Sequence, residues 1–316
     1  MPDRYSRGWF LTTPMGRALR TITKLHGPAP RFSDLCPLLT TPFPENINEP
    51  IELHEACDLR AKELVEKYQT IYVCWSGGVD STLVAAYLGK HKKPDTELIL
   101  SVSDQSLQDA SSGVLDALVA QGYSTEEISP DRMREVASLG GMVVCGHHAD
   151  SILLGELVDD TGAYESIWTM SPTEMISNHT GVSLEAAAGL LHDIEPLLAK
   201  MPFERTAANI AWWIDFTCFW DTDEMDFMIR FGLEPPGVGY VCFFGTPEFQ
   251  RWAMRDVSEK AGNTEATYKH QYVSLISSIL GKHEFVTKNR LDVGCANAYS
   301  SRMVKIREDY TVVCTR

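Results

Sequence analysis

Basic residues are scarce in this sequence. The 316 residues contain 28 Lys and Arg against 43 Asp and Glu, so the net charge is −15 at pH 7, and no run of Lys or Arg offsets it locally. Proteins that follow a nucleic-acid backbone neutralise its phosphates with basic side chains. The composition therefore argues against a nucleic-acid partner and favours a small-molecule substrate.

Long apolar segments are also missing. The most apolar stretch, residues 207–220, is too short to span a bilayer and contains Asn209 and Asp215. The first seven residues lack the apolar core of a signal peptide. We therefore expect a cytoplasmic protein with no membrane segment.

Close cysteine pairs are the third absence. The chain has eight cysteines, and none of them are spaced like the ligands of a zinc site or the thiols of a redox motif. We expect reduced and mostly buried thiols. With 44% hydrophobic and 22% charged residues, the chain has enough apolar material for a substantial core.

The most informative segment that is present is residues 76–82, Ser-Gly-Gly-Val-Asp-Ser-Thr, which we call the glycine loop. The β-branched and aromatic residues at 71–75 predict a buried strand before it, and the apolar spacing at 83–88 predicts a helix after it. Adjacent glycines let the backbone approach an anion closely, and the helix N-terminus adds partial positive charge. The loop therefore predicts a polyphosphate site. The alternative is an ordinary turn with Asp80 or Ser81 as the helix N-cap.

The glycine loop differs from the common mononucleotide loop. No Gly-Lys-Ser/Thr follows it, and Asp80 stands where a lysine is expected. A carboxylate tolerates a neighbouring triphosphate when a divalent cation lies between them, which indicates magnesium. The pattern SGGxDS resembles the PP-loop of the ATP pyrophosphatases, which cleave ATP between the α and β phosphates. This resemblance implies bound ATP and Mg2+, with Asp80 as a metal ligand and with ATP contacts from Ser76, Gly77, Gly78, Asp80, Ser81 and Thr82.

A second distinctive segment, residues 145–156, follows the predicted strand at 141–145. The carboxyl ends of parallel strands meet at one crevice, so we expect Asp150 to face the glycine loop. The segment resembles the loop of asparagine synthetases and the related β-lactam synthetases in which an aspartate helps to hold magnesium and pyrophosphate. By this resemblance Asp150 is the second metal ligand. Ser151 replaces the glutamate usual in that family, which leaves one carboxylate fewer for the metal.

The side chains before Asp150 have two interpretations each. His147 and His148 are candidate bases or metal ligands, yet adjacent residues on an extended segment point in different directions and do not form one chelating pair. Cys145 is a candidate sulfur-transfer nucleophile. It ends a predicted strand and has no second thiol close in sequence, which favours a core thiol.

The resemblance also covers two lysine segments. Tyr268-Lys269 and residues 286–290 are similar to the last two lysine-bearing segments of the asparagine synthetases. This similarity implies that Lys288, and secondarily Lys269, are catalytic residues that contact the ATP phosphates and stabilise charge as pyrophosphate leaves. The alternative for each is an ordinary solvated lysine. In the same family the adenosine is held mainly through the backbone, at positions that match Ile71, Val102, Cys145 and Gly146.

The similarity extends over roughly residues 65–290 and includes no glutaminase domain. We therefore expect the nitrogen to come from free ammonia, from another amine or from a separate glutaminase subunit. The leading hypothesis is ATP-dependent adenylation of a substrate carboxylate with release of pyrophosphate, followed by amide formation. A PP-loop enzyme that modifies an RNA base and a nucleotide-binding protein without turnover are the alternatives.

The chain divides into three predicted parts. Residues 1–50 are rich in proline and predict an irregular arm, residues 51–156 a nucleotide-binding core, and residues 157–316 a mainly helical substrate part. The expected fold is α/β, a doubly wound parallel sheet of the PP-loop, HUP-like kind, with a helical C-terminal part. Strands are predicted at 71–75, 98–102 and 141–145, and helices at 51–68, 114–120, 183–200, 205–231, 246–258 and 264–280.

Overall fold

A computed structural model of the chain describes most of residues 49–281 and two short C-terminal strands. The described ranges are 49–110, 113–154, 166–180, 183–193, 195–199, 201–213, 216, 239–262, 267–281, 304–306 and 312–314. The arm predicted at 1–50 lies almost wholly outside the described residues, and Lys288 lies outside them as well.

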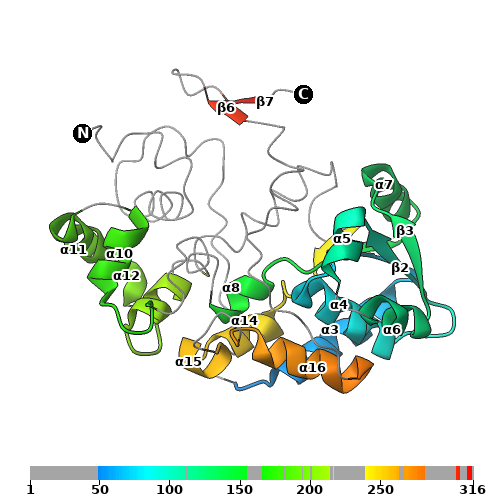
Figure 1. Cartoon of the computed structure of the whole chain (residues 1–316), viewed down its shortest axis with the longest axis horizontal. Coiled ribbons are helices and arrows are strands. Elements are labelled where there is room, and N and C mark those ends of the chain that lie inside the picture. The colour runs from blue at the N-terminus through cyan, green and yellow to red at the C-terminus, as the bar shows by residue number, and fades with distance from the viewer. Residues whose placement is uncertain are drawn as a thin grey trace.

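Five parallel strands form the central sheet (Figure 1). Their order is β3-β2-β1-β4-β5, and every neighbouring pair is parallel. The strands are β1 Thr70–Cys74, β2 Glu97–Val102, β3 Tyr123–Glu127, β4 Met142–Cys145 and β5 Tyr240–Cys242. This arrangement confirms an α/β fold with a parallel sheet, and β1, β2 and β4 correspond to the three predicted strands.

Most of the helices connect or cover these strands, whereas α10, α11 and α12 form a separate group away from them (Figure 1). In chain order the helices are α3 Leu53–Lys67, α4 Val79–Lys90, α5 Asp104–Asp109, α6 Val114–Ala120, α7 Pro130–Ser138, α8 Ala149–Leu153, α10 Pro172–Thr180, α11 Leu184–Asp193, α12 Glu195–Leu198, α14 Pro247–Ala253, α15 Val257–Lys260 and α16 His270–Leu280. Two C-terminal strands, β6 Val304–Ile306 and β7 Val312–Cys314, form an antiparallel pair. Within the described ranges, none of the helices has both the length and the apolar character needed to cross a membrane.

The strand order places the ends of β1 and β4 side by side. The sheet extends from β1 through β2 to β3 in one direction, whereas β4 and β5 lie on the other side of β1. Val73 pairs with Val144, so the loops that follow the two strands leave from the same edge of the sheet. Parallel α/β sheets commonly bind their ligands at such a switch point.

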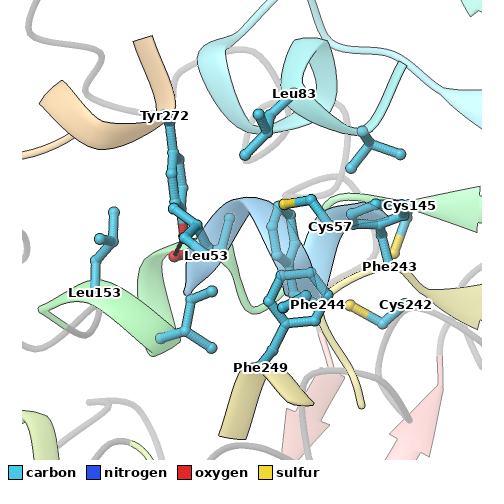
Figure 2. Close-up of a cluster of buried hydrophobic side chains, with 14 of the residues drawn as sticks. Leu53, Cys57, Leu83, Cys145, Leu153, Cys242, Phe243, Phe244, Phe249 and Tyr272 are labelled. Carbon is cyan, nitrogen blue, oxygen red and sulfur yellow. Dashed lines mark hydrogen bonds between the residues drawn. The ribbon is translucent and has the colours of Figure 1, made fainter. Parts of the chain in front are cut away.

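An aromatic cluster joins distant parts of the chain (Figure 2). Phe244, just after β5, stacks on Tyr272 of α16 with the ring centroids 5.9 Å apart and meets Phe249 of α14 at 5.0 Å. Tyr272 donates a hydrogen bond of 2.7 Å to the carbonyl of Ala149, the first residue of α8. These contacts fix α16 relative to α8. Asp150 lies in α8, and Lys269 is the N-cap residue of α16.

Two strands of the central sheet, β3 and β5, have no counterpart in the sequence prediction, and neither do the C-terminal strands β6 and β7. The region after residue 156, expected to be mainly helical, contributes β5 to the sheet, and a strand of three residues gives only a weak pattern. The sequence of β3, Tyr-Ser-Thr-Glu-Glu, is polar because this strand lies at the edge of the sheet with mostly exposed side chains.

Where they fall on described residues, the helix predictions hold in position and differ in extent. Helices α3 and α6 match the predictions at 51–68 and 114–120. The single helix expected at 246–258 is two helices, α14 and α15, because Asp256 caps α15 by accepting a hydrogen bond from the Ser258 N–H. The helix expected at 183–200 is likewise divided into α11 and α12, and the one expected at 264–280 begins as α16 only at His270. Of the helix expected at 205–231, residues 207–213 and 216 are helical. Residues 214–215 and 217–231 lie outside the described residues.

Candidate functional site

The glycine loop joins β1 to α4. Gly78 is the N-cap of α4, and no side chain makes a capping hydrogen bond there. Asp80 and Ser81 therefore do not act as N-caps, contrary to that part of the ordinary-turn interpretation. Instead the Ser76 N–H donates to Ser81 Oγ at 3.1 Å, and the hydroxyl oxygens of these two serines lie 3.1 Å apart in a second hydrogen bond. The two bonds fix the loop onto the first turn of the helix.

Two neighbouring loops pack closely on the glycine loop. Gly77 has a φ of +76°, and a Cβ added there would lie 2.3 Å from the carbonyl oxygen of Ser106 in α5. A Cβ at Gly146 would lie 3.3 Å from the backbone nitrogen of Ser81. Glycine at these positions therefore allows close contact among the loops that follow β1, β2 and β4. A compact backbone cradle at a helix N-terminus suits the phosphate groups that the sequence predicts.

Two carboxylates meet beside this loop. Asp80 is the second residue of α4, and Asp150 is the second residue of α8. Both contact the ammonium of Lys269, at 2.6 Å from Asp80 Oδ2 and 2.8 Å from Asp150 Oδ1. The lysine side chain is only 10% exposed, whereas Asp80 is 24% and Asp150 38% exposed. The structure thus brings together three predicted site residues from three separate helix starts.

The electrostatics of this cluster keep Lys269 positively charged. Burial alone would lower the pKa of the ammonium, but Asp150 and Asp80 together outweigh burial and raise that pKa well above its ordinary value. Tyr268 donates a hydrogen bond of 3.0 Å from its hydroxyl to Asp150 Oδ1. Burial, together with the charge of Asp150, raises the pKa of Tyr268, so the phenol remains a neutral donor. The sequence singled out Tyr268 only as the neighbour of Lys269, and the hydrogen bond to a distant aspartate carries no sequence signal.

The donors of this cluster fit a magnesium ion. Mg2+ prefers oxygen ligands, commonly one or two carboxylates together with phosphate oxygens and water. Asp80 and Asp150 supply two carboxylates that converge on a single cation, here the ammonium of Lys269. In the part of the chain that the structure describes, no group of three or more His, Cys, Asp and Glu could hold a metal ion. A metal bound between these two aspartates would need phosphate oxygens and water to complete its shell.

Ser151 belongs to the core rather than to this acidic cluster. Ser151 is 1% exposed, and its carbonyl accepts a hydrogen bond of 2.7 Å from Trp212 Nε1. Trp212 itself stacks on Phe216 with the ring centroids 5.0 Å apart. The position that, by the resemblance in sequence, corresponds to a glutamate of the asparagine synthetases is therefore occupied by a small, buried residue whose carbonyl accepts a hydrogen bond from a tryptophan.

The other predicted ATP contacts lie in or near the sheet. Thr82 is fully buried, and its Oγ1 accepts a hydrogen bond of 3.1 Å from Trp75 Nε1. Ile71 is fully buried near the start of β1, at the end of the strand away from the glycine loop. Cys145 is buried at the end of β4, and Val102 is half-buried at the end of β2. The side chains of Thr82 and Ile71 thus serve the core, and contacts of these four residues to ATP remain predictions.

The loop after β4 contains a histidine in a rare backbone conformation. His148, immediately before α8, has a φ of 66°, in the left-handed region that residues other than glycine seldom adopt. It is buried, and burial lowers its pKa to about 3, so the imidazole is neutral at physiological pH. The carbonyl of His147 accepts a hydrogen bond of 2.6 Å from Cys242 Sγ, which ties this loop to β5.

A scan of the chain against models of protein families finds no match, and a search of curated proteins finds no similar sequence. The resemblance to the PP-loop ATP pyrophosphatases therefore depends on the motif residues themselves. Of these, Asp80, Asp150 and Lys269 form the cluster described above, whereas Lys288 lies outside the described residues.

Proposed function

We propose that this protein binds ATP with Mg2+, cleaves the ATP to AMP and pyrophosphate by adenylating a substrate carboxylate, and then forms an amide with ammonia or an amine. The observation that carries this proposal is the convergence of Asp80, Asp150 and Lys269 beside the glycine loop. A backbone cradle for phosphate, a carboxylate pair for a divalent cation and a buried positive charge are the groups that nucleotide cleavage needs.

Each part of the site has a separate task in this proposal. The backbone N–H groups of the glycine loop and the start of α4 hold the pyrophosphate end of ATP. Asp80 and Asp150 hold Mg2+, which neutralises phosphate charge when it is bound. Lys269 supplies a buried positive charge near the phosphates, where such a charge acts more strongly than it would in water. Tyr268 holds Asp150 in place through its hydrogen bond to Oδ1.

The carboxylate and the amine in the proposal come from the resemblance to the asparagine synthetases. An ionised carboxylate is a poor acyl donor, and AMP is a far better leaving group than oxide. Holding both substrates in one site lowers the entropic part of the barrier. The nitrogen source is ammonia, an amine or a separate glutaminase subunit, and the net charge of −15 disfavours a nucleic-acid substrate.

The test is a product analysis. The protein is incubated with Mg2+ and α-labelled ATP, with and without a pool of amino acids, small carboxylic acids and ammonium, and AMP is separated from ADP. We expect AMP that rises with the pool and is abolished by Asp80→Asn and by Asp150→Asn. ADP as the only labelled product, or AMP formation that survives both substitutions, would contradict the proposal.

Asp58→Asn is the matched control for this test. Asp58 also pairs with a lysine, at 2.7 Å from Lys90 Nζ, and its side chain is 23% exposed, close to the 24% of Asp80. Lys90 lies at the opposite end of α4 from Asp80. Loss of AMP formation in Asp58→Asn as well would point to a general effect of removing a paired carboxylate.

Ser151 favours one second candidate, a nucleotide-binding protein without turnover. Ser151 stands where the asparagine synthetases usually have a glutamate, so by that resemblance the site has one acidic ligand fewer. Ser151 is also buried, and its carbonyl accepts a hydrogen bond from Trp212. Tight, Mg2+-dependent ATP binding with no AMP under any mixture of substrates would favour this candidate over the ligase.

A further inference from the structure

The ammonium of Lys269 lies at the position that a metal ion bound by both Asp80 and Asp150 would occupy. Its ammonium is 2.6 Å from Asp80 Oδ2 and 2.8 Å from Asp150 Oδ1. We propose that Lys269 is a built-in counter-cation, which a divalent metal displaces only when polyphosphate is present to receive the ammonium. Metal and nucleotide would then bind as a unit. This inference rests on the proposed function in taking Asp80 and Asp150 as the metal ligands.

Charge and burial require the ammonium to leave when the metal ion binds, and we call this step the exchange. A divalent cation bound by the same two oxygens would lie within a few ångströms of the ammonium, and like charges at that distance repel strongly in a partly buried site. The lysine side chain is only 10% exposed, so it has little access to water in its present position. An ammonium that leaves two carboxylates in such surroundings needs a new anionic partner. The phosphates of a nucleotide held by the glycine loop are that partner in the proposed site.

The surrounding contacts allow the side chain to move while the site keeps its shape. Lys269 is the N-cap residue of α16, so its backbone is anchored by that helix. The helix is in turn fixed by Tyr272, whose hydroxyl donates to the Ala149 carbonyl at 2.7 Å. Tyr268 also donates to Asp150 Oδ1, the same oxygen that Lys269 contacts. Asp150 therefore keeps one positioning contact after Lys269 has left, and only the flexible lysine side chain needs to rearrange.

The exchange predicts positive coupling between metal and nucleotide. In the wild-type protein, Mn2+ alone should bind weakly, and each ligand should raise the affinity of the other by at least about tenfold, since such coupling is reciprocal. Lys269→Met removes the competing cation. It should bind Mn2+ alone at least about tenfold more tightly than the wild type does, and the coupling should shrink accordingly.

The experiment measures Mn2+ binding by electron paramagnetic resonance, without nucleotide and with the non-cleavable analogue α,β-methylene-ATP at fixed free Mn2+. Lys269→Met is compared with Lys269→Arg, which keeps the charge and should remain close to the wild type. Lys62→Met is the control, because Lys62 is exposed on α3 and its substitution removes the same unit of charge. Equal Mn2+ affinity of wild type and Lys269→Met in the absence of nucleotide would overturn the inference.

The wild-type protein gives an independent answer if Lys269→Met does not fold. Weak binding of Mn2+ alone with a gain of about tenfold or more on adding the analogue supports the exchange, and tight binding of Mn2+ alone overturns it. Failure of the exchange is distinguishable from failure of the proposed function. AMP formation together with unchanged Mn2+ affinity in Lys269→Met rejects only the exchange. A gain in Mn2+ affinity in Lys269→Met, together with coupling between Mn2+ and the analogue in a wild-type protein that forms no AMP, rejects only the proposed function.

Discussion

Two lysine–carboxylate clusters in this protein share their distances and differ in their surroundings. Lys90 contacts Asp58 at 2.7 Å near the end of α4, and Lys269 contacts Asp80 and Asp150 at 2.6 and 2.8 Å near its start. The Lys90 side chain is 41% exposed, whereas that of Lys269 is 10% exposed and faces two carboxylates. Distance alone therefore does not distinguish a surface ion pair from a candidate site. Burial and the second carboxylate distinguish the two clusters, because removal of the Lys269 ammonium would leave two partly buried carboxylates without a counter-charge.

The largest expected difference between the two clusters is in activity. Asp80→Asn should lower AMP formation by about 100-fold or more, because it removes a metal ligand next to the phosphates. Asp58→Asn should change it by less than about twofold, since this pair lies at the opposite end of α4 from Asp80. Initial rates of AMP release with saturating Mg2+ give the comparison. Similar losses in both variants would remove the distinction between the clusters.

The next difference is in stability. Lys269→Met leaves two partly buried carboxylates without their cation and should lower the free energy of unfolding by about 2 to 3 kcal/mol in the presence of EDTA. Lys90→Met should cost less than about 1 kcal/mol, as exposed pairs do. Urea denaturation measures both values. Addition of Mg2+ should restore part of the loss in Lys269→Met and leave Lys90→Met unchanged.

His148 shows what burial does to a basic group when burial has the largest influence on its pKa. Its pKa is lowered to about 3, while an unfolded chain has a histidine pKa of about 6.5. The unfolded protein therefore binds the proton first, and stability is lost as pH falls from about 6.5 toward 3. Between pH 7 and pH 5 this group alone should cost about 2 kcal/mol.

His148→Asn should remove this part of the pH dependence, because asparagine tolerates the left-handed conformation at a φ of 66° and does not titrate. His54→Asn is the control, since His54 is exposed on α3. Unfolding free energies of the wild type and both variants at pH 7 and pH 5 provide the measurement. Equal slopes in the wild type and His148→Asn would show that His148 does not carry the effect.

The smallest expected effect comes from the hydrogen bond between Tyr268 and Asp150 within the Lys269 cluster. Tyr268→Phe removes one hydrogen bond to Asp150 and keeps the ammonium contacts, so it should raise the Mg2+ concentration needed for half-maximal AMP formation by about fivefold, or about 1 kcal/mol. Tyr123→Phe is the matched control, because Tyr123 donates a buried hydrogen bond of 2.8 Å to the Ala85 carbonyl in the middle of α4. Tyr123→Phe should lower stability without changing the Mg2+ dependence.

The sequence predicted the parts of the fold that have strong local patterns. The buried strand before the glycine loop and the helix after it are β1 and α4, and Gly77 has the positive φ of +76° that glycine adopts without strain. The pattern did not reveal β3 and β5, since a polar edge strand and a strand of three residues owe their structure to pairing with neighbours. At the break between α14 and α15, Asp256 caps α15, and the N–H of Val257 donates to Asn209 Oδ1 from a distant part of the chain.

By itself, the sequence determined that a glycine-containing turn joins a strand to a helix and that Asp80 and Asp150 follow two strands of a parallel sheet. From these two facts the shared edge follows, because parallel strands end on the same side. Only the tertiary structure decided which cation lies between the carboxylates. Lys269 is 189 residues from Asp80 in the chain, and it reaches that aspartate because α16 is fixed against α8 by Tyr272. Local pattern sets backbone conformation, whereas the partner of a buried charge is set by packing between distant segments.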